Sequence, residues 1–420
     1  MKSHPHIHNN RRVVVTGLGV VSSIGIGVDV FWKNLIAGRS GITKIESFDT
    51  SEYPVHKGGE VKDFRPQDFI DKRRIKSIGR ASQMAIAAAK LAVEDAKIDK
   101  DKVGCAGVFM GTTLGEAKLI EKMNESLAKD DHSSIEERNI FLYPMNSIPI
   151  NIALELNLGS YNFMFPNACA AGNYALGYAF DLIRSEKLDL AFAGGSDAFS
   201  RVAFVGFNRL MVMAPDRCQP FDKNRKGMLL GEGAAMLILE SLEHAEKRKA
   251  KIYAEVLGYG LSCDAHHMTQ PSEQGIVKCI EKAIKSSGIS KDDVDYISAH
   301  GTGTPQNDRA ECAAIKNVFA KRYKDIPCSS IKSMLGHTMG AASAIESITC
   351  CLAIKHGILP PTINYETPDN DCDLDLVPNK LRKMKVSIAL NNSCAFGGNN
   401  ACVNFSRFIK HINYNCIFKN

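Results

Sequence analysis

The sequence predicts an α/β protein built from two related halves. Two segments, 188–198 and 386–398, are almost continuously apolar, as strands buried on both faces are. Two alanine-rich stretches, 81–96 and 341–355, repeat apolar residues at helical spacing. Strands and helices alternate along the chain, and this order is typical of sheets covered by helices on both faces.

Recurring segments predict that the two halves arose by duplication. RRVVVTGLGVVSS at 11–23 and KIYAEVLGYGLSC at 251–263 are apolar runs that each carry a pair of glycines. We interpret them as the opening strand of each half. VGCAGVFMGTTLG at 103–115 and VDYISAHGTGTPQ at 294–306 are each a strand that ends in a turn containing Gly-Thr.

A third pair of segments extends this pattern. We align NACAAGN at 167–173 with NSCAFGGN at 392–399, since both combine a cysteine with small residues. The predicted organisation is two halves of similar construction, at residues 11–248 and 251–409, with a short tail at each end, at residues 1–10 and 410–420.

Composition excludes several classes of protein. The chain has 420 residues, of which 45% are hydrophobic and 23% charged, so it can bury a large core and is not disordered. A formal net charge of +6 does not indicate nucleic-acid binding but suits an acidic protein partner. No stretch reaches the roughly 18 apolar residues of a membrane helix, and we expect a soluble, cytoplasmic protein.

The cysteine content indicates a reducing compartment. Thirteen cysteines occur without a C-x-x-C pair, which fits neither a disulfide framework nor a zinc ribbon. We expect most of them to be small buried apolar residues. His4, His6 and His8 alternate as metal ligands could, but their place in the N-terminal tail favours an exposed segment without a metal.

Cys169 is the candidate nucleophile. It lies just before an apolar-periodic helix, where free amide groups and the helix dipole are expected to lower a thiol pKa below about 8.5. Its neighbours Ala168 and Ala170 leave room for a substrate. One cysteine among many is weak evidence, so this hypothesis depends on partner residues elsewhere in the chain.

Two histidines are the candidate partners. His300 ends a predicted strand and precedes the turn GTGTPQND, whose hydroxyls, on Thr302 and Thr304, could bind the amides of an extended ligand. His337 lies between an apolar segment and a helix of small residues. Active sites of α/β folds gather at such strand-to-helix junctions. Each histidine alone is more typical of a structural role, but the pair together with Cys169 favours a catalytic site.

Two competing motifs are incomplete. TGLGVVSS at 16–23 resembles a dinucleotide loop, but Ser22 stands where the third glycine is needed. Gly194 to Ala198 resembles a serine nucleophile elbow, but Ala198 replaces the closing glycine. Neither hydride transfer nor serine hydrolysis is supported.

The combined motifs resemble the elongating β-ketoacyl-acyl-carrier-protein synthases of fatty acid and polyketide synthesis. The resemblance covers about residues 11–408 and rests on six ordered segments: VVVTGLGVVSSIG, NACAAGNYALG, CQPFDKNRKGMLLGEGAAMLILESLEHA, HGTGTPQND, KSMLGHTMGAAS and NNSCAFGGNN. It implies a thiolase-like fold of five layers, α-β-α-β-α, and a homodimer. It also implies an acyl carrier protein as partner, and no metal or redox cofactor.

The resemblance assigns a reaction to the three candidate residues. Cys169 would take the acyl chain as a thioester, with the amides of Cys169 and Phe396 as oxyanion hole. His300 and His337 would stabilise the enolate formed when malonyl-carrier-protein loses carbon dioxide. The carbanion would then attack the thioester, giving a β-ketoacyl product.

Further residues would support this chemistry. Lys332 and Glu311 match positions thought to support the histidines, with a surface salt bridge as the alternative for each. Thr302 and Thr304 would bind the phosphopantetheine amides. Phe396 would gate the acyl pocket, with core packing as the alternative.

Three residues of the segment 392–399 depart from the family pattern. Cys394 stands where phenylalanine is usual, Ala395 where glycine is usual and Asn399 where threonine is usual. Ala395 is expected to stiffen the gating loop. These departures concern the substrate, and a synthase specialised for polyene, aryl or other secondary-metabolite chains stays open.

Two other functions stay open beside the condensing enzyme. A thiolase-like acyltransferase would use Cys394 as a second cysteine, although the thiolase C-x-G arrangement is missing. A non-catalytic chain-length subunit would be expected to lack the nucleophile, and Cys169 argues against it.

A basic segment offers a docking site for the acidic carrier protein. DKRRIKSIGR at 71–80 carries five cations: Lys72, Arg73, Arg74, Lys76 and Arg80. Such a cluster would steer association with an acidic partner. A solvated helix face is the alternative.

Overall fold

The computed structural model describes residues 11–99, 103–131, 133 and 139–410. The predicted tail 1–10 with its three histidines, and residues 411–420 with Cys416, lie outside the described residues. Ten of the twelve described cysteines are buried, in line with the expectation for this residue type. Within the described part of the chain, no helix is both long and apolar enough to cross a membrane.

Ten of the strands form two five-stranded arrays that share one topology. The first array has the order β1 (Val13–Ser22), β8 (Gly233–Ser241), β7 (Leu190–Asp197), β5 (Gly107–Gly111) and β6 (Asn162–Phe165). The second has the order β9 (Ala254–Cys263), β15 (Asn399–Ser406), β14 (Ile388–Ser393), β10 (Tyr296–Ser298) and β11 (Cys328–Ser329). In each array the last three strands are parallel and the first three antiparallel.

The two arrays join into one mixed sheet through β1 and β9. Val13–Val15 pair antiparallel with Ala254–Val256, and the short β2 (Gly25–Ile26) pairs with the end of β1. Two small hairpin-like pairs lie apart from this sheet: β3 (Thr43–Lys44) with β4 (Lys57–Gly58), and β12 (Ile358–Leu359) with β13 (Arg382–Lys383).

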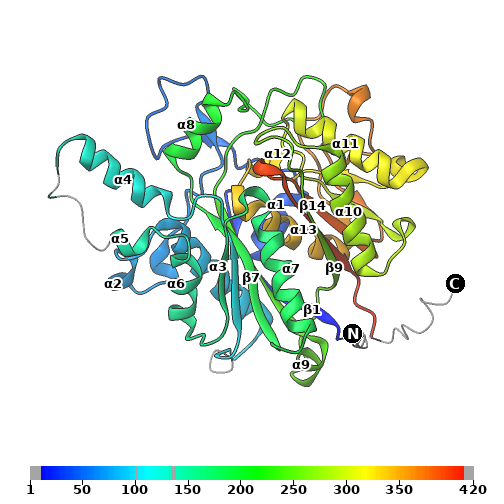
Figure 1. Cartoon of the computed structure of the whole chain (residues 1–420), viewed down its shortest axis with the longest axis horizontal. Coiled ribbons are helices and arrows are strands. Elements are labelled where there is room, and N and C mark those ends of the chain that lie inside the picture. The colour runs from blue at the N-terminus through cyan, green and yellow to red at the C-terminus, as the bar shows by residue number, and fades with distance from the viewer. Residues whose placement is uncertain (1–10, 100–102, 132, 134–138, 411–420) are drawn as a thin grey trace, which may run out of the picture.

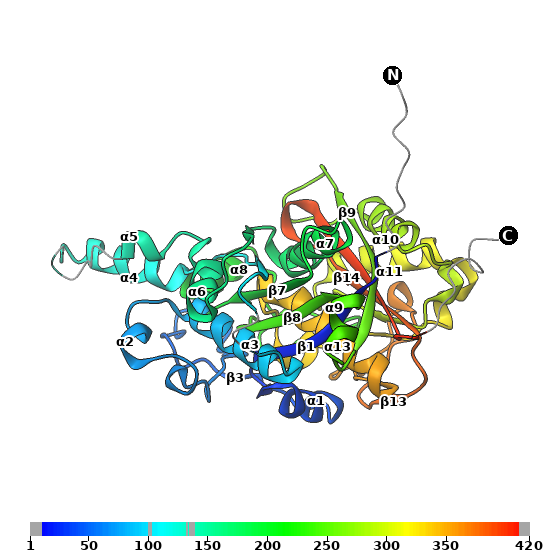
Figure 2. The same cartoon turned by 90° about the horizontal axis from the view of Figure 1, so that it is seen from below.

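Helices cover both arrays and also lie between them (Figures 1 and 2). On the first half, α3 (Arg80–Ala96) packs on β1 and β8, and α6 (Ser147–Leu156) packs on β5 and β6. On the second half, α10 (Glu273–Ser287) packs on β9 and β15, and α11 (Pro305–Phe319) packs beside α10. The resulting order of layers is α-β-α-β-α, as the resemblance implied.

The central layer consists of α7 (Ala171–Arg184) and α13 (Ala342–His356), which contact each other. Each also reaches strands of both halves, α7 touching β5, β7 and β15, and α13 touching β14 and β8. Because α13 is enclosed on all sides, it is buried from Ala342 to Ile354. Small residues allow this approach: a Cβ on Gly172 would lie 2.8 Å from the backbone nitrogen of Ala344.

The remaining helices are peripheral or short. They are α1 (Val28–Ile36), α2 (Lys72–Ile75), α4 (Ala117–Ala128), α5 (Asn139–Leu142), α8 (Arg201–Arg209), α9 (Leu242–Lys247) and α12 (Lys332–Leu335). Three 3₁₀ turns border the site described below: η4 (Ala168–Ala170), η7 (Met339–Ala341) and η9 (Phe396–Gly398).

The structure confirms two of the three predicted repeats. Segments 11–23 and 251–263 form β1 and β9, and segments 103–115 and 294–306 contain β5 and β10, in equivalent places of the two arrays. The third alignment is wrong, because 167–173 follows β6 whereas 392–399 joins β14 to β15. The two segments resemble each other because both carry small residues in tight turns.

The predicted strand 386–398 is too long. β14 ends at Ser393, and the chain turns through η9, where Gly397 has φ +81° and Gly398 has φ +75°. Glycine adopts such a left-handed backbone readily, and the left-handed turn at these two residues prevents the strand from continuing. The predicted helices 81–96 and 341–355 correspond to α3 and α13 within one residue.

Candidate active site

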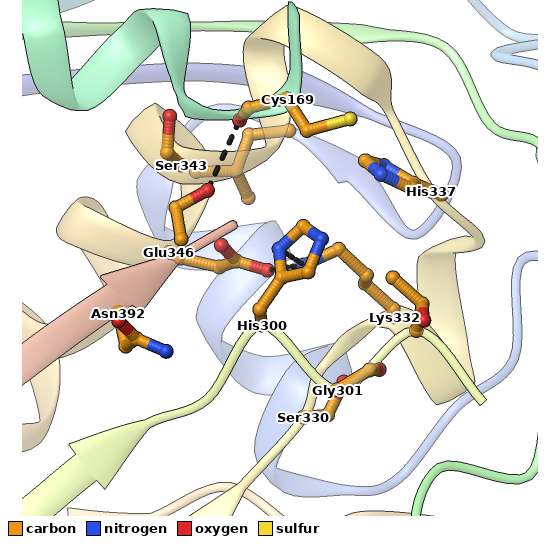
Figure 3. A network of polar contacts seen from close by, with 12 residues as sticks. Cys169, His300, Gly301, Ser330, Lys332, His337, Ser343, Glu346 and Asn392 are labelled. Atoms are coloured by element: carbon orange, nitrogen blue, oxygen red, sulfur yellow. Dashed lines mark hydrogen bonds and ion pairs between the residues drawn. The ribbon is translucent and has the colours of Figure 1, made fainter. Parts of the chain in front are cut away.

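Cys169 lies in the turn η4, between strand β6 and helix α7. The preceding residue, Ala168, has φ +51°, a left-handed conformation that is strained for alanine and reverses the chain sharply. The carbonyl of Cys169 accepts a hydrogen bond of 3.1 Å from the Ser393 hydroxyl, so the β14 end of the second half holds this turn. Figure 3 shows the sulfur directed toward the imidazole of His337.

The expectation of a lowered pKa at Cys169 is wrong for this structure. Only 6% of the residue is exposed, and burial raises the pKa of its thiol to about 12. The positive charge of Lys332 lowers the pKa and the negative charge of Asp197 raises it, but desolvation is larger than either. The thiol is therefore neutral in the free protein, although it lies next to a helix N-terminus.

His300 follows β10 and is fixed at its backbone and at its ring. Its amide and that of Gly301 donate to the two carboxylate oxygens of Glu311, at 2.7 and 2.8 Å. The side chain of Asn392 also donates to Glu311, at 2.7 Å. At the ring, Nδ1 lies 3.4 Å from the ammonium Nζ of Lys332. Since an ammonium group only donates, Nδ1 is the acceptor and the ring proton sits on Nε2.

His337 is fixed in the same tautomer by a different group. Its amide donates to Leu229 at 2.6 Å, and its carbonyl accepts from Gly231 at 3.0 Å. The amide of Met339 donates to Nδ1 at 3.1 Å, so the proton of this ring also sits on Nε2. Met339 has φ +54°, and this turn directs its amide back at the ring.

The three candidate side chains converge in one cluster. The ligand atoms of Cys169, His300 and His337 lie within 4.8 Å of one another, and the two ring centroids are 5.4 Å apart. Burial lowers the pKa of both imidazoles well below 6.5, and the charge of Lys332 lowers them further. Both rings are therefore neutral at neutral pH and present N–H donors to the pocket.

Lys332 is buried, so the alternative of a surface salt bridge is excluded for it, as it is for Glu311. Lys332 forms an ion pair with Glu346 of α13, and burial raises the pKa of Glu346 to about 7. The sequence prediction missed Glu346. A single carboxylate in the otherwise uncharged segment ASAIESITCC was the signal that could have found it.

A cation is disfavoured at this cluster. The cluster of Cys169, His300 and His337 is the one group of three or more potential metal ligands found among the described residues. The ammonium group of Lys332 lies within 3.4 Å of His300, and both Nδ1 atoms are already acceptors of protein hydrogen bonds. The residues thus fit neutral and anionic oxygen ligands better than a metal ion.

The cluster lies in a pocket of about 390 Å³. Thr302 and Thr304 line it, and their hydroxyls are hydrogen-bonded to each other at 2.8 Å. The other walls are mostly apolar and come from the α8 region, the loop 267–271 and the turn η9; they include Phe207, Leu210, Met211, Met228, Met268, Cys394, Ala395 and Phe396. A pocket with an apolar wall and two hydroxyls suits an acyl chain on an amide-bearing arm.

Phe396 lies at the turn of η9 and contacts Phe207 of α8, with ring centroids 5.9 Å apart. The next amide, of Gly397, donates to the carbonyl of Met268 at 2.7 Å, which links the turn to the loop 267–271. Ala395 has φ −129° and ψ 152°, an extended conformation open to any residue, so alanine fits here without strain. Cys394 is buried, and Asn399 begins β15 opposite Cys263.

The predicted docking cations lie on and beside α2, away from the pocket lining. Lys72, Arg73 and Lys76 are exposed, and Arg73 pairs with Asp71. Arg74 is half-buried and pairs with Glu155. Arg80 pairs with the buried Glu232. The structure therefore leaves three of the five cations at the surface.

Comparison with known proteins agrees with this geometry. The family model of the β-ketoacyl synthase N-terminal domain matches residues 10–245, and that of the C-terminal domain matches residues 253–366. The 3-oxoacyl-[acyl-carrier-protein] synthase 2 of Staphylococcus aureus (strain COL) is 38% identical over 412 residues, which cover 95% of this chain and 99% of the relative. The enzyme of the same name from Coxiella burnetii is 38% identical over 94% of this chain and 99% of its own.

Solved structures give the same result. The ishigamide ketosynthase/chain length factor superposes with a TM-score of 0.92 and 45% identity, covering 95% of this chain and all of that one. A type II polyketide synthase acyl-carrier protein in complex with its ketosynthase contains a chain with a TM-score of 0.87 and 34% identity, over 95% of this chain and 100% of that chain.

These findings define a condensing enzyme of the thiolase superfamily. The chain belongs to the β-ketoacyl synthase family, whose members lengthen acyl chains by Claisen condensation.

Proposed function

We propose that Cys169, His300 and His337 perform a decarboxylative condensation between an acyl thioester and malonyl-carrier-protein. The observation that carries this proposal is the convergence of one thiol and two neutral imidazoles at one wall of a largely apolar pocket. Both imidazoles direct Nε2–H away from their protein partners, so two donors are free for a substrate oxygen.

In the first half-reaction, the sulfur of Cys169 attacks the thioester carbonyl of the acyl-carrier-protein. The amides of Cys169 and Phe396 stabilise the oxyanion, and the carbon–sulfur bond to phosphopantetheine breaks. The thiol proton of Cys169 ends on the departing phosphopantetheine sulfur, so no net proton is needed. A neutral thiol in the free protein is compatible with this exchange, and a reducing, cytoplasmic setting keeps it free.

In the second half-reaction, malonyl-carrier-protein occupies the pocket with its thioester carbonyl oxygen between His300 and His337. The carbon–carbon bond to the carboxylate breaks and carbon dioxide leaves. The electron pair of the broken bond stays behind and forms an enolate. Negative charge on the enolate oxygen develops only as the bond breaks, so the two N–H donors stabilise the transition state more than the ground state. The carbanion attacks the acyl carbonyl on Cys169, whose sulfur leaves and recovers a proton from solvent.

Other residues position these groups. Lys332 holds the Nε2–H tautomer of His300, and Glu311 holds the backbone of the same histidine. Thr302 and Thr304 bind the phosphopantetheine amides, and Phe396 gates the acyl pocket. No metal or redox cofactor takes part in this scheme.

Intact-protein mass spectrometry tests the nucleophile. We expect acyl-carrier-protein to add one acyl group to the unmodified enzyme and to Cys394→Ala, and none to Cys169→Ala. Acylation that persists in Cys169→Ala would overturn the proposal. Condensation that proceeds without release of carbon dioxide and is lost in Cys394→Ala would favour the thiolase alternative. Release of carbon dioxide from malonyl-carrier-protein by the double variant His300→Ala, His337→Ala at the unmodified rate would overturn the enolate site.

We propose further that two copies of the chain associate through β6. This strand ends its array and pairs only with β5, so one edge of backbone groups is open among the described strands. Apolar side chains gather beside it: Tyr161, Phe163 and Tyr178 are each about 40% exposed, as is Ile150 of α6. Figure 2 shows α4 and α5 projecting at one end of the molecule, beyond α6. An exposed edge with such a patch suits a self-complementary interface.

Light scattering after size exclusion tests this interface. We expect a dimer for the unmodified chain and a monomer for Phe163→Arg, whereas Val202→Arg, on the exposed face of α8, should stay dimeric. A chain that is monomeric when purified alone would overturn the homodimer and favour pairing with a different subunit.

We propose that the acidic carrier protein docks on the exposed cations on and beside α2, Lys72, Arg73 and Lys76. Their exposure supports steering by charge, which weakens with salt. We expect KM for carrier protein to rise with salt and in Lys72→Glu, Lys76→Glu, with kcat retained. The matched control, Lys278→Glu, Lys285→Glu, changes the same net charge on α10. A KM that is unchanged in the α2 variant, or equally raised in the α10 variant, would remove this site.

A further inference from the structure

Asp197 is a buried carboxylate that the reaction scheme does not use. It is the last residue of β7 and has no exposed surface. It belongs to the segment 194–198, whose likeness to a serine elbow was incomplete. Among the described residues, no cation forms a hydrogen bond or ion pair with it, and its partners are N–H and O–H donors.

Four hydrogen bonds join Asp197 to two other segments. Oδ1 accepts from the Thr112 hydroxyl at 2.8 Å and from the Leu114 amide at 3.0 Å. Oδ2 accepts from the Thr113 amide at 2.7 Å and from the Gly340 amide at 2.7 Å. The carboxylate therefore holds the loop after β5 and the turn η7 at the end of β7.

The hydrogen bond from the Gly340 amide connects Asp197 to His337 through the neighbouring residue Met339. Gly340 directly follows Met339, whose amide fixes the tautomer of His337. Met339 is left-handed, at φ +54°, a conformation that persists in a residue with a side chain only when its surroundings hold it. Asp197 supplies that hold through the next amide.

This turn also packs closely against neighbouring backbone. A Cβ on Gly340 would lie 2.5 Å from the backbone of Thr112, and one on Gly195 would lie 2.4 Å from the Gly340 carbonyl oxygen. The three segments thus meet at van der Waals distance around the Asp197 carboxylate. If this side chain loses one of its hydrogen-bond acceptors, at least one of the three segments must move.

We propose that Asp197 is a positioning residue for His337: by binding the Gly340 amide it holds the strained Met339 turn that keeps the proton of His337 on Nε2. This inference rests on the proposed enolate-stabilising role of His337. It predicts that loss of Asp197 affects decarboxylation more than acylation, because Cys169 lies on a different turn.

Asp197→Asn tests the proposal with little change in volume. The amide of asparagine must face either Leu114 or Gly340 and Thr113, so at least one N–H donor meets another donor. We expect the ¹⁵N signals of His337, assigned with His337→Asn, to show loss of the single Nε2–H tautomer. We expect decarboxylation of malonyl-carrier-protein to fall by about 10- to 100-fold, the effect of a small misplacement. Acylation of Cys169 should not fall, because removal of the Asp197 charge lowers the pKa of that thiol.

Three further variants separate positioning from loss of structure. Thr112→Val removes one bond to Oδ1 but keeps the Gly340 bond, and should retain the His337 tautomer. Asp197→Glu keeps a carboxylate and should recover part of the decarboxylation rate. Asp295→Asn removes a carboxylate that accepts from Ser387 and Ile388 at 2.6 and 3.0 Å, far from the cluster, and should lower Tm without changing the His337 signals.

The outcomes separate the positioning role of Asp197 from the proposed function of His337. An unchanged His337 tautomer in Asp197→Asn, or equal losses of acylation and decarboxylation, would overturn the positioning role. A changed tautomer with an unchanged decarboxylation rate would leave the positioning role in place and overturn the proposed function of His337.

Discussion

At the scale of single residues, burial rather than the helix dipole decides the state of the nucleophile. Cys169 packs with Ala170, Ala395 and Ala401, and these methyl groups offer no solvation to a thiolate. A helix N-terminus contributes a fraction of a kcal/mol to about 2 kcal/mol, whereas burial of an unpaired charge costs more. Two neutral imidazoles beside the thiol follow from the same burial.

The raised pKa of Cys169, to about 12, sets the pH dependence of its alkylation. Below the pKa, the thiolate fraction rises about tenfold for each pH unit. We therefore expect the rate of iodoacetamide reaction at Cys169 in the free enzyme to rise in that proportion from about pH 7 to 9 without a plateau. Peptide mass spectrometry resolves Cys169 from the exposed Cys105, which serves as the reference thiol. A rate that levels off below about pH 8 would show that the thiolate is stabilised after all.

At the scale of elements, the same turn occurs before both central helices. η4 precedes α7 and starts at the left-handed Ala168, while η7 precedes α13 and starts at the left-handed Met339. The structural counterpart of Cys169 is thus Gly340, the second residue of η7. One copy of the turn presents the nucleophile, and the other holds the ring of His337.

The close approach of α7 and α13 gives a prediction for Gly172. Gly172→Ala would place a Cβ 2.8 Å from the Ala344 nitrogen, and we expect it to lower the free energy of unfolding by about 1–3 kcal/mol. Gly206→Ala is the matched control, since a Cβ there has no neighbour within 4 Å, and it should stabilise α8 by up to about 1 kcal/mol. Chemical denaturation measures both. Equal and small effects would mean that the central helices can move apart without cost.

At the scale of the whole molecule, a buried polar network connects the two halves beneath the site. The side-chain amide of Asn173 in α7 donates to the Ala401 carbonyl at 3.2 Å, and the backbone amide of Asn173 donates to the Ser343 hydroxyl at 3.1 Å. Asn391 of β14 and Ser347 of α13 each donate to its side-chain oxygen at 3.1 Å. One asparagine of the first half thus satisfies groups on three elements of the second.

Removing this connection should destabilise the molecule more than removing a bond within one half. We expect Asn173→Ala to lower the free energy of unfolding by at least about 2 kcal/mol, because several buried groups lose their partner at about 1–3 kcal/mol each. Asn404→Ala removes a bond of 2.9 Å to Ser287 inside the second half and should cost about 1 kcal/mol. Urea unfolding compares them, and a larger loss in Asn404→Ala would contradict the special role of the network.

The sequence by itself determined the fold class, the duplication and the three residues of the cluster. Apolar strands, helical periodicity, the glycine-rich turn after His300 and the small residues around Cys169 are local patterns, so they can be recognised without the fold. Thr302, Thr304 and Phe396 followed from the motifs that contain them, and all three line the pocket.

Only the tertiary structure showed that the third repeat alignment is wrong. It also decided the pKa of Cys169, the tautomers of the two histidines and the roles of Glu346 and Asp197. Each depends on atoms brought together from distant positions, such as Lys332 with Glu346 or Asp197 with Gly340. Burial and hydrogen-bond direction are properties of a packed interior, and they come into being only when the layers close around the side chain.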